Sequence, residues 1–160
     1  LPYMIKAYTI QKRIGKDVDF PESAGAIIET IEFIPYMSAY QNLADIAAMR
    51  GNLSKTQIKE VLEMVGLGNV GRKHVSKFSM GMRQRLAIAQ AVMESPKLLI
   101  LDEPMNGMDE KGVEEMRRLI LARKAAGTTI ILFSHNIEDI RILCDQVYRI
   151  DAGVVMREVE

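Results

Sequence analysis

The sequence is poor in the features that mark several large classes of protein. It contains one cysteine, Cys144, and no tryptophan. A single cysteine excludes an internal disulfide and indicates a reducing compartment. Lysine plus arginine and aspartate plus glutamate both number 21, so the formal net charge is zero. Because a neutral chain lacks the basic surface that binds nucleic acid, we expect no nucleic-acid partner.

Long apolar runs are also missing. Runs such as 98–101 and 130–133 are far shorter than the roughly 18–20 apolar residues that cross a bilayer. Residues 1–10 do not show the basic start and long apolar stretch of a secretory signal. We therefore expect a cytoplasmic chain without direct membrane insertion. Since the sequence begins with Leu1 rather than methionine, we also expect it to be part of a longer protein.

The apolar pattern predicts one core built from strands and helices. Ser54, followed three residues later by Gln57, indicates the start of a helix that ends near Gly66. Other helices are expected over 41–50, 83–94, 109–126 and 136–143, and strands over 8–10, 26–28, 98–101, 128–133, 147–150 and 154–156, with a turn at 15–17.

The order of these elements predicts an α/β fold. After residue 96 strands and helices alternate, which is typical of parallel pairing through crossover helices. A block of helices stands ahead of this alternation. The last two strands are joined through residues 151–153 and are expected to form a hairpin.

Two carboxylates follow the apolar run 98–101, in the sequence LLILDEP. A buried strand that ends this way places Asp102 and Glu103 at the edge where open α/β sheets bind ligands. Asp102 is suited to hold Mg²⁺, and Glu103 to orient or deprotonate an attacking water. The alternative is a strand that simply ends in a polar turn.

A serine and a glycine stand before the expected helix 83–94, in the sequence FSMGMRQR. The hydroxyl of Ser79, the backbone at Gly81 and the positive helix end together predict an anion site. An ordinary serine cap with glycine in the preceding turn remains the alternative.

A histidine, His135, follows the second apolar strand. At the carboxyl edge of a strand it could donate to a phosphate oxygen or to the attacking water. The alternative is a loop histidine without a role, which is how we interpret His74.

Taken in order, these features resemble the ATP-binding-cassette family. Residues 79–82 resemble its signature motif, LLILDEP resembles Walker B with Glu103 as the catalytic glutamate, and His135 resembles the switch histidine. Residues 106–109, ending in Asp109, resemble the D-loop. The resemblance extends from about Gly15 to the end of the chain.

The sequence also departs from the family pattern. Met80 and Met82 stand in the signature, and Glu29 occupies the position of the Q-loop glutamine. Both variants resemble the branch that includes bacitracin and lantibiotic export or immunity systems. Glu29 can still ligate Mg²⁺ or water through its charge, so we retain it as a nucleotide-site residue.

The resemblance implies a P-loop NTPase-like core with an inserted helical subdomain. Residues 1–30 would be the remnant of the amino-terminal β part with the Q-loop, 31–95 the helical subdomain, and 96–160 the rest of the ATPase core. It implies ATP and Mg²⁺ as cofactors, a transmembrane permease partner, a second ATP-binding subunit paired head to tail, and a location at the inner face of the membrane.

The phosphate-binding motif of the family is absent from the printed sequence. No glycine is followed by four residues, glycine, lysine and then serine or threonine. We therefore expect weak ATP binding and negligible hydrolysis by this chain alone, and we expect strand 98–101 to keep an open edge. Ser79, Gly81 and Asp109, in contrast, would act in the site of a partner.

Three interpretations remain open at this stage. The chain is part of a transporter ATPase, a truncated regulatory subunit that presents its signature to a partner, or a related protein that acts on ribosomes or chromosomes. The last would carry basic patches, long coiled coils or duplicated cassettes, and none is visible in the sequence.

Overall fold

A computed structural model describes residues 3–4, 23–28, 32–50, 53–152 and 154–158. The helices are α1 (Ala39–Arg50), α2 (Lys55–Met64), α3 (Met80–Val92), α4 (Glu110–Ala125) and α5 (Ile137–Leu143), with single 3₁₀ turns η1 (Gly68–Val70) and η2 (Val75–Lys77). The strands are β1 (Tyr3–Met4), β2 (Ala24–Ile27), β3 (Leu98–Asp102), β4 (Thr129–Phe133), β5 (Val147–Asp151) and β6 (Val154–Glu158).

Strands β2, β3 and β4 form a parallel sheet in that order. The expected α/β class and parallel pairing are therefore confirmed. The expectation that strand 98–101 keeps an open edge is wrong, because β2 pairs with one side of β3 and β4 with the other. The sequence pattern identifies strands but does not give their order in the sheet. Strands β5 and β6 form the expected antiparallel hairpin, and β1 pairs with β5.

The contact between β2 and α3 is very close. A Cβ built on Gly25 would overlap the carbonyl oxygen of Ala91, so only glycine fits this position. One face of the sheet is fully buried, with the side chains of Ile27, Leu99, Leu101, Ile130 and Leu132.

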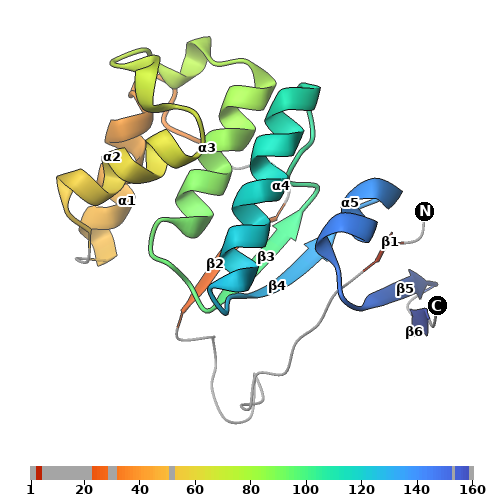
Figure 1. The fold of residues 1–160 in the computed structure, drawn as a ribbon. Coiled ribbons are helices and arrows are strands. Elements are labelled where there is room, and N and C mark those ends of the chain that lie inside the picture. Colours follow the sequence, from red (N-terminus) through yellow and green to blue (C-terminus); the bar gives the residue numbers. More distant parts are fainter. Residues whose placement is uncertain (1–2, 5–22, 29–31, 51–52, 153, 159–160) are drawn as a thin grey trace.

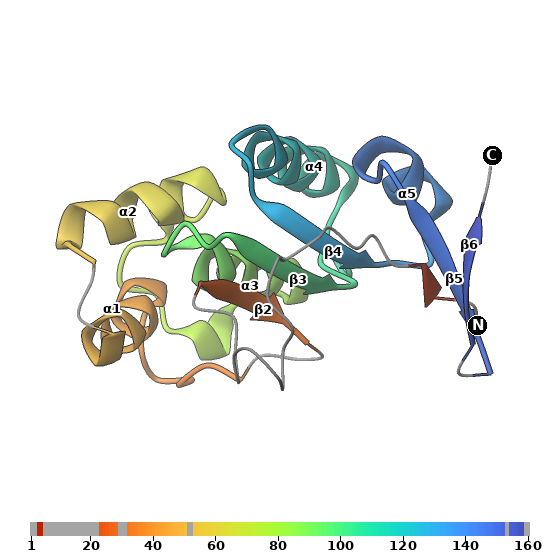
Figure 2. The same cartoon turned by 90° about the horizontal axis from the view of Figure 1, so that it is seen from below.

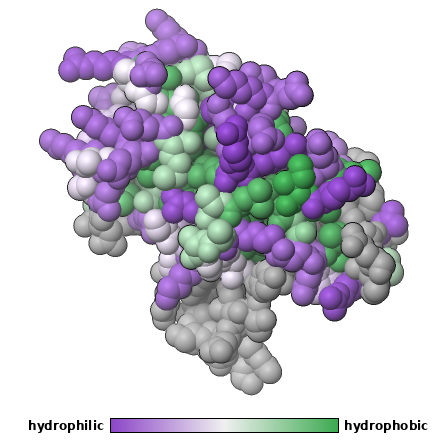
Figure 3. All heavy atoms as spheres, viewed as in Figure 1, coloured by the Kyte–Doolittle hydropathy of each residue, from purple (hydrophilic) through white to green (hydrophobic). Residues whose placement is uncertain are grey.

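The helices and the hairpin lie at different places around the parallel sheet. Helices α3 and α4 lie side by side, with α1 and α2 at one end of the molecule and the β5–β6 hairpin at the other (Figures 1 and 2). Polar side chains cover the visible surface of α2, whereas apolar side chains are visible between α4 and α5 (Figure 3). No helix in the described part of the chain combines the length and apolar composition needed to cross a membrane.

Helix ends follow the capping residues in the sequence. Helix α2 begins with the expected capping box, in which Ser54 Oγ accepts from Gln57 N and Gln57 Oε1 accepts from Ser54 N. Helix α4 likewise begins after Asp109, whose carboxylate caps it.

Other predicted boundaries need correction. The expected start of a helix at residue 83 is wrong, because Ser79 caps α3 and the helix begins at Met80. Glycine is a weak helix former, yet in a first turn its amide needs no partner within the helix. The strand expected over 26–28 begins two residues earlier, at Ala24. The strand expected over 8–10 and the turn at 15–17 lie outside the described residues.

Candidate functional site

The carboxylates predicted from LLILDEP lie where β3 ends. Asp102 is the last residue of β3 and is half-buried. Glu103 follows in the left-handed region, with φ of 43°, which a residue with a side chain rarely adopts. Its amide donates to the carbonyl oxygen of Phe133 over 3.0 Å, and its own carbonyl accepts from Asn106 N over 3.1 Å. The Glu103 backbone is thus fixed between the end of β4 and the following turn.

His135 contacts the Glu103 carboxylate with both its backbone and its ring. The amide of His135 donates to Glu103 Oε1 over 3.0 Å, and ring Nδ1 lies 2.6 Å from the same oxygen. Parallel pairing of β3 and β4, in which Asp102 faces Phe133, brings together two residues that are 32 positions apart. The His135 side chain is 64% exposed, so its free ring edge faces solvent.

This contact changes the protonation of the imidazole. The hydrogen bond to Glu103, and then the negative charge of Glu103, raise the pKa of His135 above 6.5. Since the folded pKa is raised, the charged pair is present at low pH and is lost as the pH rises through that pKa.

Replacing Glu103 by glutamine in the complete protein is expected to lower the titration midpoint of His135. Glutamine still accepts a hydrogen bond but carries no charge, so the protonated ring loses most of its stabilisation. The midpoint is measured by NMR of the imidazole ring, with the exposed Glu110→Gln substitution as a control. An unchanged midpoint in Glu103→Gln would contradict the pairing.

The signature residues lie at the start of α3. Ser79 Oγ accepts from Met82 N over 3.2 Å, which is the cap considered as the alternative to an anion site. Gly81 lies in the first turn of α3, and a Cβ there would stand 3.0 Å from the Gly107 carbonyl oxygen. Helix α3 therefore begins directly against the turn at residues 106–109.

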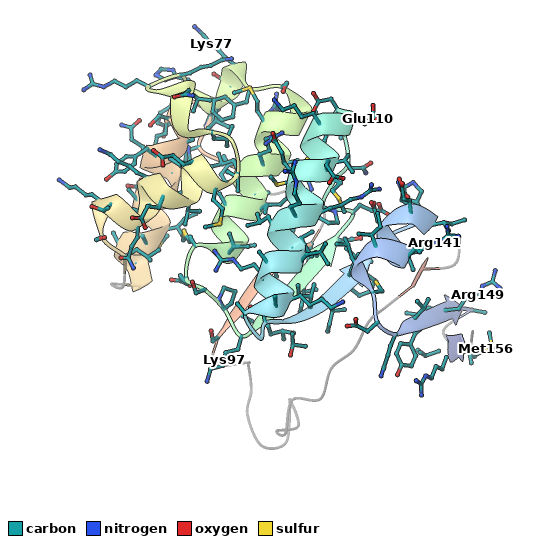
Figure 4. All side chains as sticks on the ribbon, in the orientation of Figure 1. Lys77, Lys97, Glu110, Arg141, Arg149 and Met156 are labelled. Atoms are coloured by element: carbon teal, nitrogen blue, oxygen red, sulfur yellow. The ribbon has the colours of Figure 1, made fainter. Side chains whose placement is uncertain are left out.

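Asp109 borders a surface hollow beside the start of α3. Its Oδ1 accepts from Gly112 N over 3.0 Å and caps α4. In Figure 4 the labelled side chains of Lys77 and Glu110 mark where α3 and α4 begin. Lys97, just before β3, lies far from them. The hollow measures about 590 Å³, and Ser79, Gly81 and Asp109 all line it. The signature and D-loop positions therefore share one concave surface.

The structure thus separates the predicted residues into two groups. Glu103 and His135 touch each other beside Asp102, whereas none of these three lines the hollow that holds Ser79, Gly81 and Asp109. Glu29 lies outside the described residues. A larger hollow of about 680 Å³ lies near His74 and contains none of the predicted site residues among its described lining.

Asp102 has the chemistry of a partial Mg²⁺ site. Among the described residues its carboxylate makes no hydrogen bond or ion pair, and no group of three histidine, cysteine or acidic residues is close enough to hold a metal ion. Mg²⁺ is usually held by one or two carboxylates together with phosphate oxygens and water. A single half-buried carboxylate beside Glu103 fits that donor set.

Three side chains near these groups could not be predicted from the sequence. Gln84 Nε2 donates to the Glu103 carbonyl oxygen over 3.3 Å. Arg85 contacts both Val65 O, over 2.8 Å, and Glu115, over 2.7 Å, and so joins α3 to the end of α2 and to α4.

The third side chain that could not be predicted is the nearly buried Arg117. It pairs with Asp139 and Glu138 in the first turn of α5. Asn136 caps the same turn and adjoins His135. The sequence carries no local signal for these contacts, because each joins elements that are distant along the chain.

Comparison with known proteins gives consistent results. A family model described as ABC transporter matches residues 7–106. The chain is 43% identical over 142 residues to the uncharacterized ABC transporter ATP-binding protein YybJ of Bacillus subtilis (strain 168), covering 89% of this chain and 65% of that protein. It is 42% identical over 136 residues to the lantibiotic transport ATP-binding protein SrtF of Streptococcus pyogenes, covering 85% and 59%.

Solved structures agree with the sequence matches. The dimeric structure of MJ0796, a bacterial ABC transporter cassette, superposes with a TM-score of 0.67 at 25% identity, covering 75% of this chain and 55% of that one. Matches named for bacitracin and for lantibiotic transport both occur, which confirms the expected resemblance to that branch. The chain spans 65% or less of the length of these curated relatives.

Proposed function

Because the chain belongs to the ABC transporter family, we propose that it is part of an ATP-binding subunit that couples ATP hydrolysis to transport through a membrane permease. The observation that carries the proposal is the contact of Glu103 with His135 at the carboxyl end of β3, beside the half-buried carboxylate of Asp102. Open α/β sheets bind ligands at this edge.

The proposed chemistry divides among these residues. Asp102 would help to hold Mg²⁺, which neutralises charge on the β- and γ-phosphates when bound. The Glu103 carboxylate would orient the attacking water and accept its proton. His135, held by that carboxylate, would place its exposed ring edge toward the terminal phosphate. Glu29 would contact Mg²⁺ or water from the Q-loop position.

The second group would serve a partner subunit. The Ser79 hydroxyl and the amides at the start of α3 would donate to an anion that enters the hollow, and the helix dipole would favour its negative charge. Asp109 borders the same hollow and would contact the partner's site. In a head-to-tail pair, each subunit would supply one group of residues to its own site and the other group to its partner's site. This would explain why the two groups lie apart on one chain.

A permease partner would bind elsewhere, through the helical block at residues 31–95. Three apolar side chains before and on α1 are exposed, namely Ile34, Tyr36 and Met49, the last by 80%. Exposed apolar side chains of this kind support contact with another protein.

The 160-residue chain by itself is expected to bind ATP weakly and to hydrolyse it negligibly. The glycine-rich loop and its lysine supply most contacts to the β- and γ-phosphates, and that motif does not occur in these 160 residues. ATP turnover and binding of a fluorescent ATP analogue measure this directly. Turnover equal to that of a complete ATP-binding subunit would contradict it.

A second function is supported by the intact hollow at Ser79, Gly81 and Asp109. The chain would then be a regulatory subunit that completes the site of a partner with its own phosphate-binding loop. Adding the chain to a partner whose signature serine is replaced would raise the partner's turnover in that case. A phosphate-binding motif in frame before Leu1 would instead favour the complete ATPase.

A further inference from the structure

Helix α3 contacts the backbone of Glu103 through the side chain of Gln84. Gln84 Nε2 donates to the Glu103 carbonyl oxygen over 3.3 Å in a partly buried position. Gln84 lies five residues after Ser79 and three after Gly81, and both of these residues line the hollow at the start of the same helix. The start of α3 therefore carries Ser79 and Gly81 of one group and contacts Glu103 of the other.

The Glu103 backbone depends on such contacts because its conformation is unfavourable. A φ of 43° is uncommon for a residue with a side chain. The contacts from Phe133 and Asn106 come from β4 and from the turn after β3. Within the described part of the chain, the hydrogen bond from Gln84 is the one that depends on the position of α3.

The beginning of α3 is also held firmly against the turn at residues 106–109. The Gly81 Cα lies so near the Gly107 carbonyl oxygen that a methyl group would stand 3.0 Å from it. A shift of α3 would therefore displace this turn. Through the hydrogen bond of Gln84, it would also displace the backbone of Glu103. A phosphate bound at Ser79 and Gly81 would restrict that shift.

We propose that Gln84 is a positioning residue that makes the orientation of the Glu103 carboxylate depend on occupation of the hollow at Ser79 and Gly81. The inference rests on the proposed roles of Glu103 and of the signature residues. Gln84 is not among the residues that line the hollow, and its side chain contacts the backbone of Glu103. Its loss should slow the chemical step and leave ATP binding unchanged, because the groups proposed to contact ATP remain in place.

The test is a steady-state comparison in the complete ATP-binding protein. Gln84→Met removes the donor and is expected to lower kcat about tenfold, the effect of losing one net hydrogen bond in the transition state. The KM for ATP and ATP-dependent dimerisation should remain as in the wild type. Gln84→Lys keeps a donor and should restore most of kcat. If Gln84→Met does not fold, Gln84→Glu has the same size, lacks the donor when ionised and should show the same loss.

Gln57→Met is the matched control. It removes another glutamine side chain that bonds to the backbone, because Gln57 Oε1 accepts from Ser54 N over 2.9 Å at the remote start of α2, and it should leave kcat unchanged. The inference is overturned if Gln84→Met keeps the wild-type kcat, if KM rises in place of the loss in kcat, or if Gln57→Met slows turnover equally. Glu103→Gln distinguishes failure of the proposed function from failure of the inference about Gln84. Normal turnover in Glu103→Gln overturns the proposed function. An inactive Glu103→Gln together with normal turnover in Gln84→Met overturns the inference alone.

Discussion

Replacing Glu103 by glutamine in the complete protein is expected to reduce ATP turnover by about 10²- to 10⁴-fold, the range that a positioned general base contributes. The amide cannot accept the proton of the attacking water, while its oxygen can still receive the hydrogen bonds of His135. Asp102 and the residues of the hollow are unchanged, so binding of ATP should persist.

The measurement combines turnover with dimerisation. Gel filtration with ATP and Mg²⁺ should show the Glu103→Gln protein accumulating as an ATP-bound dimer, because the step that consumes ATP is blocked. Glu110→Gln, an exposed carboxylate at the start of α4, is the matched control and should hydrolyse ATP normally. A Glu103→Gln protein with normal turnover would show that another group activates the water.

Gly25→Ala is expected to cause a large loss of stability. The new Cβ would overlap the Ala91 carbonyl oxygen, which belongs to the backbone of α3 and cannot rotate away. Strand and helix must separate, and the free energy of unfolding should fall by about 3 kcal/mol, the upper end of the usual cost of overpacking.

Urea denaturation of the complete protein measures this loss as a lower midpoint with an unchanged slope. Ala26→Ser is the matched control, since Ala26 is the next residue of β2 and is exposed on the opposite face. Equal midpoints for Gly25→Ala and the wild type would mean that β2 and α3 are not packed this closely in solution.

Strong local signals explain which parts of the fold could be predicted from the sequence. The apolar run at 98–101 and the capping pair of Ser54 and Gln57 specify a strand and the start of a helix through neighbouring residues, and both elements lie where expected. The start of α3 was misplaced because Gly81 indicated a turn. The order of strands depends on packing between distant segments, which no local pattern records.

The candidate site divides in the same way. Asp102 and His135 could be located because each follows an apolar strand, and parallel pairing then brings Glu103 to His135. Gln84 and Arg117 could not be found, because their partners lie 19 and 21 or 22 positions away on other elements. Such supporting side chains become visible only when the helices are placed against the sheet.

The contact between Met80 and Gly107 limits which segments can be exchanged between this chain and a related one in a chimeric protein. Gly107 has φ of +73°, and a Cβ there would stand 2.6 Å from the Met80 thioether, so the methionine lies over a bare backbone. A side chain at 107 would displace the thioether from this position. A chimera that receives residues 79–82 from this chain should therefore also receive residues 106–109. The start of α3 and the turn after β3 fit each other and need to be transferred together.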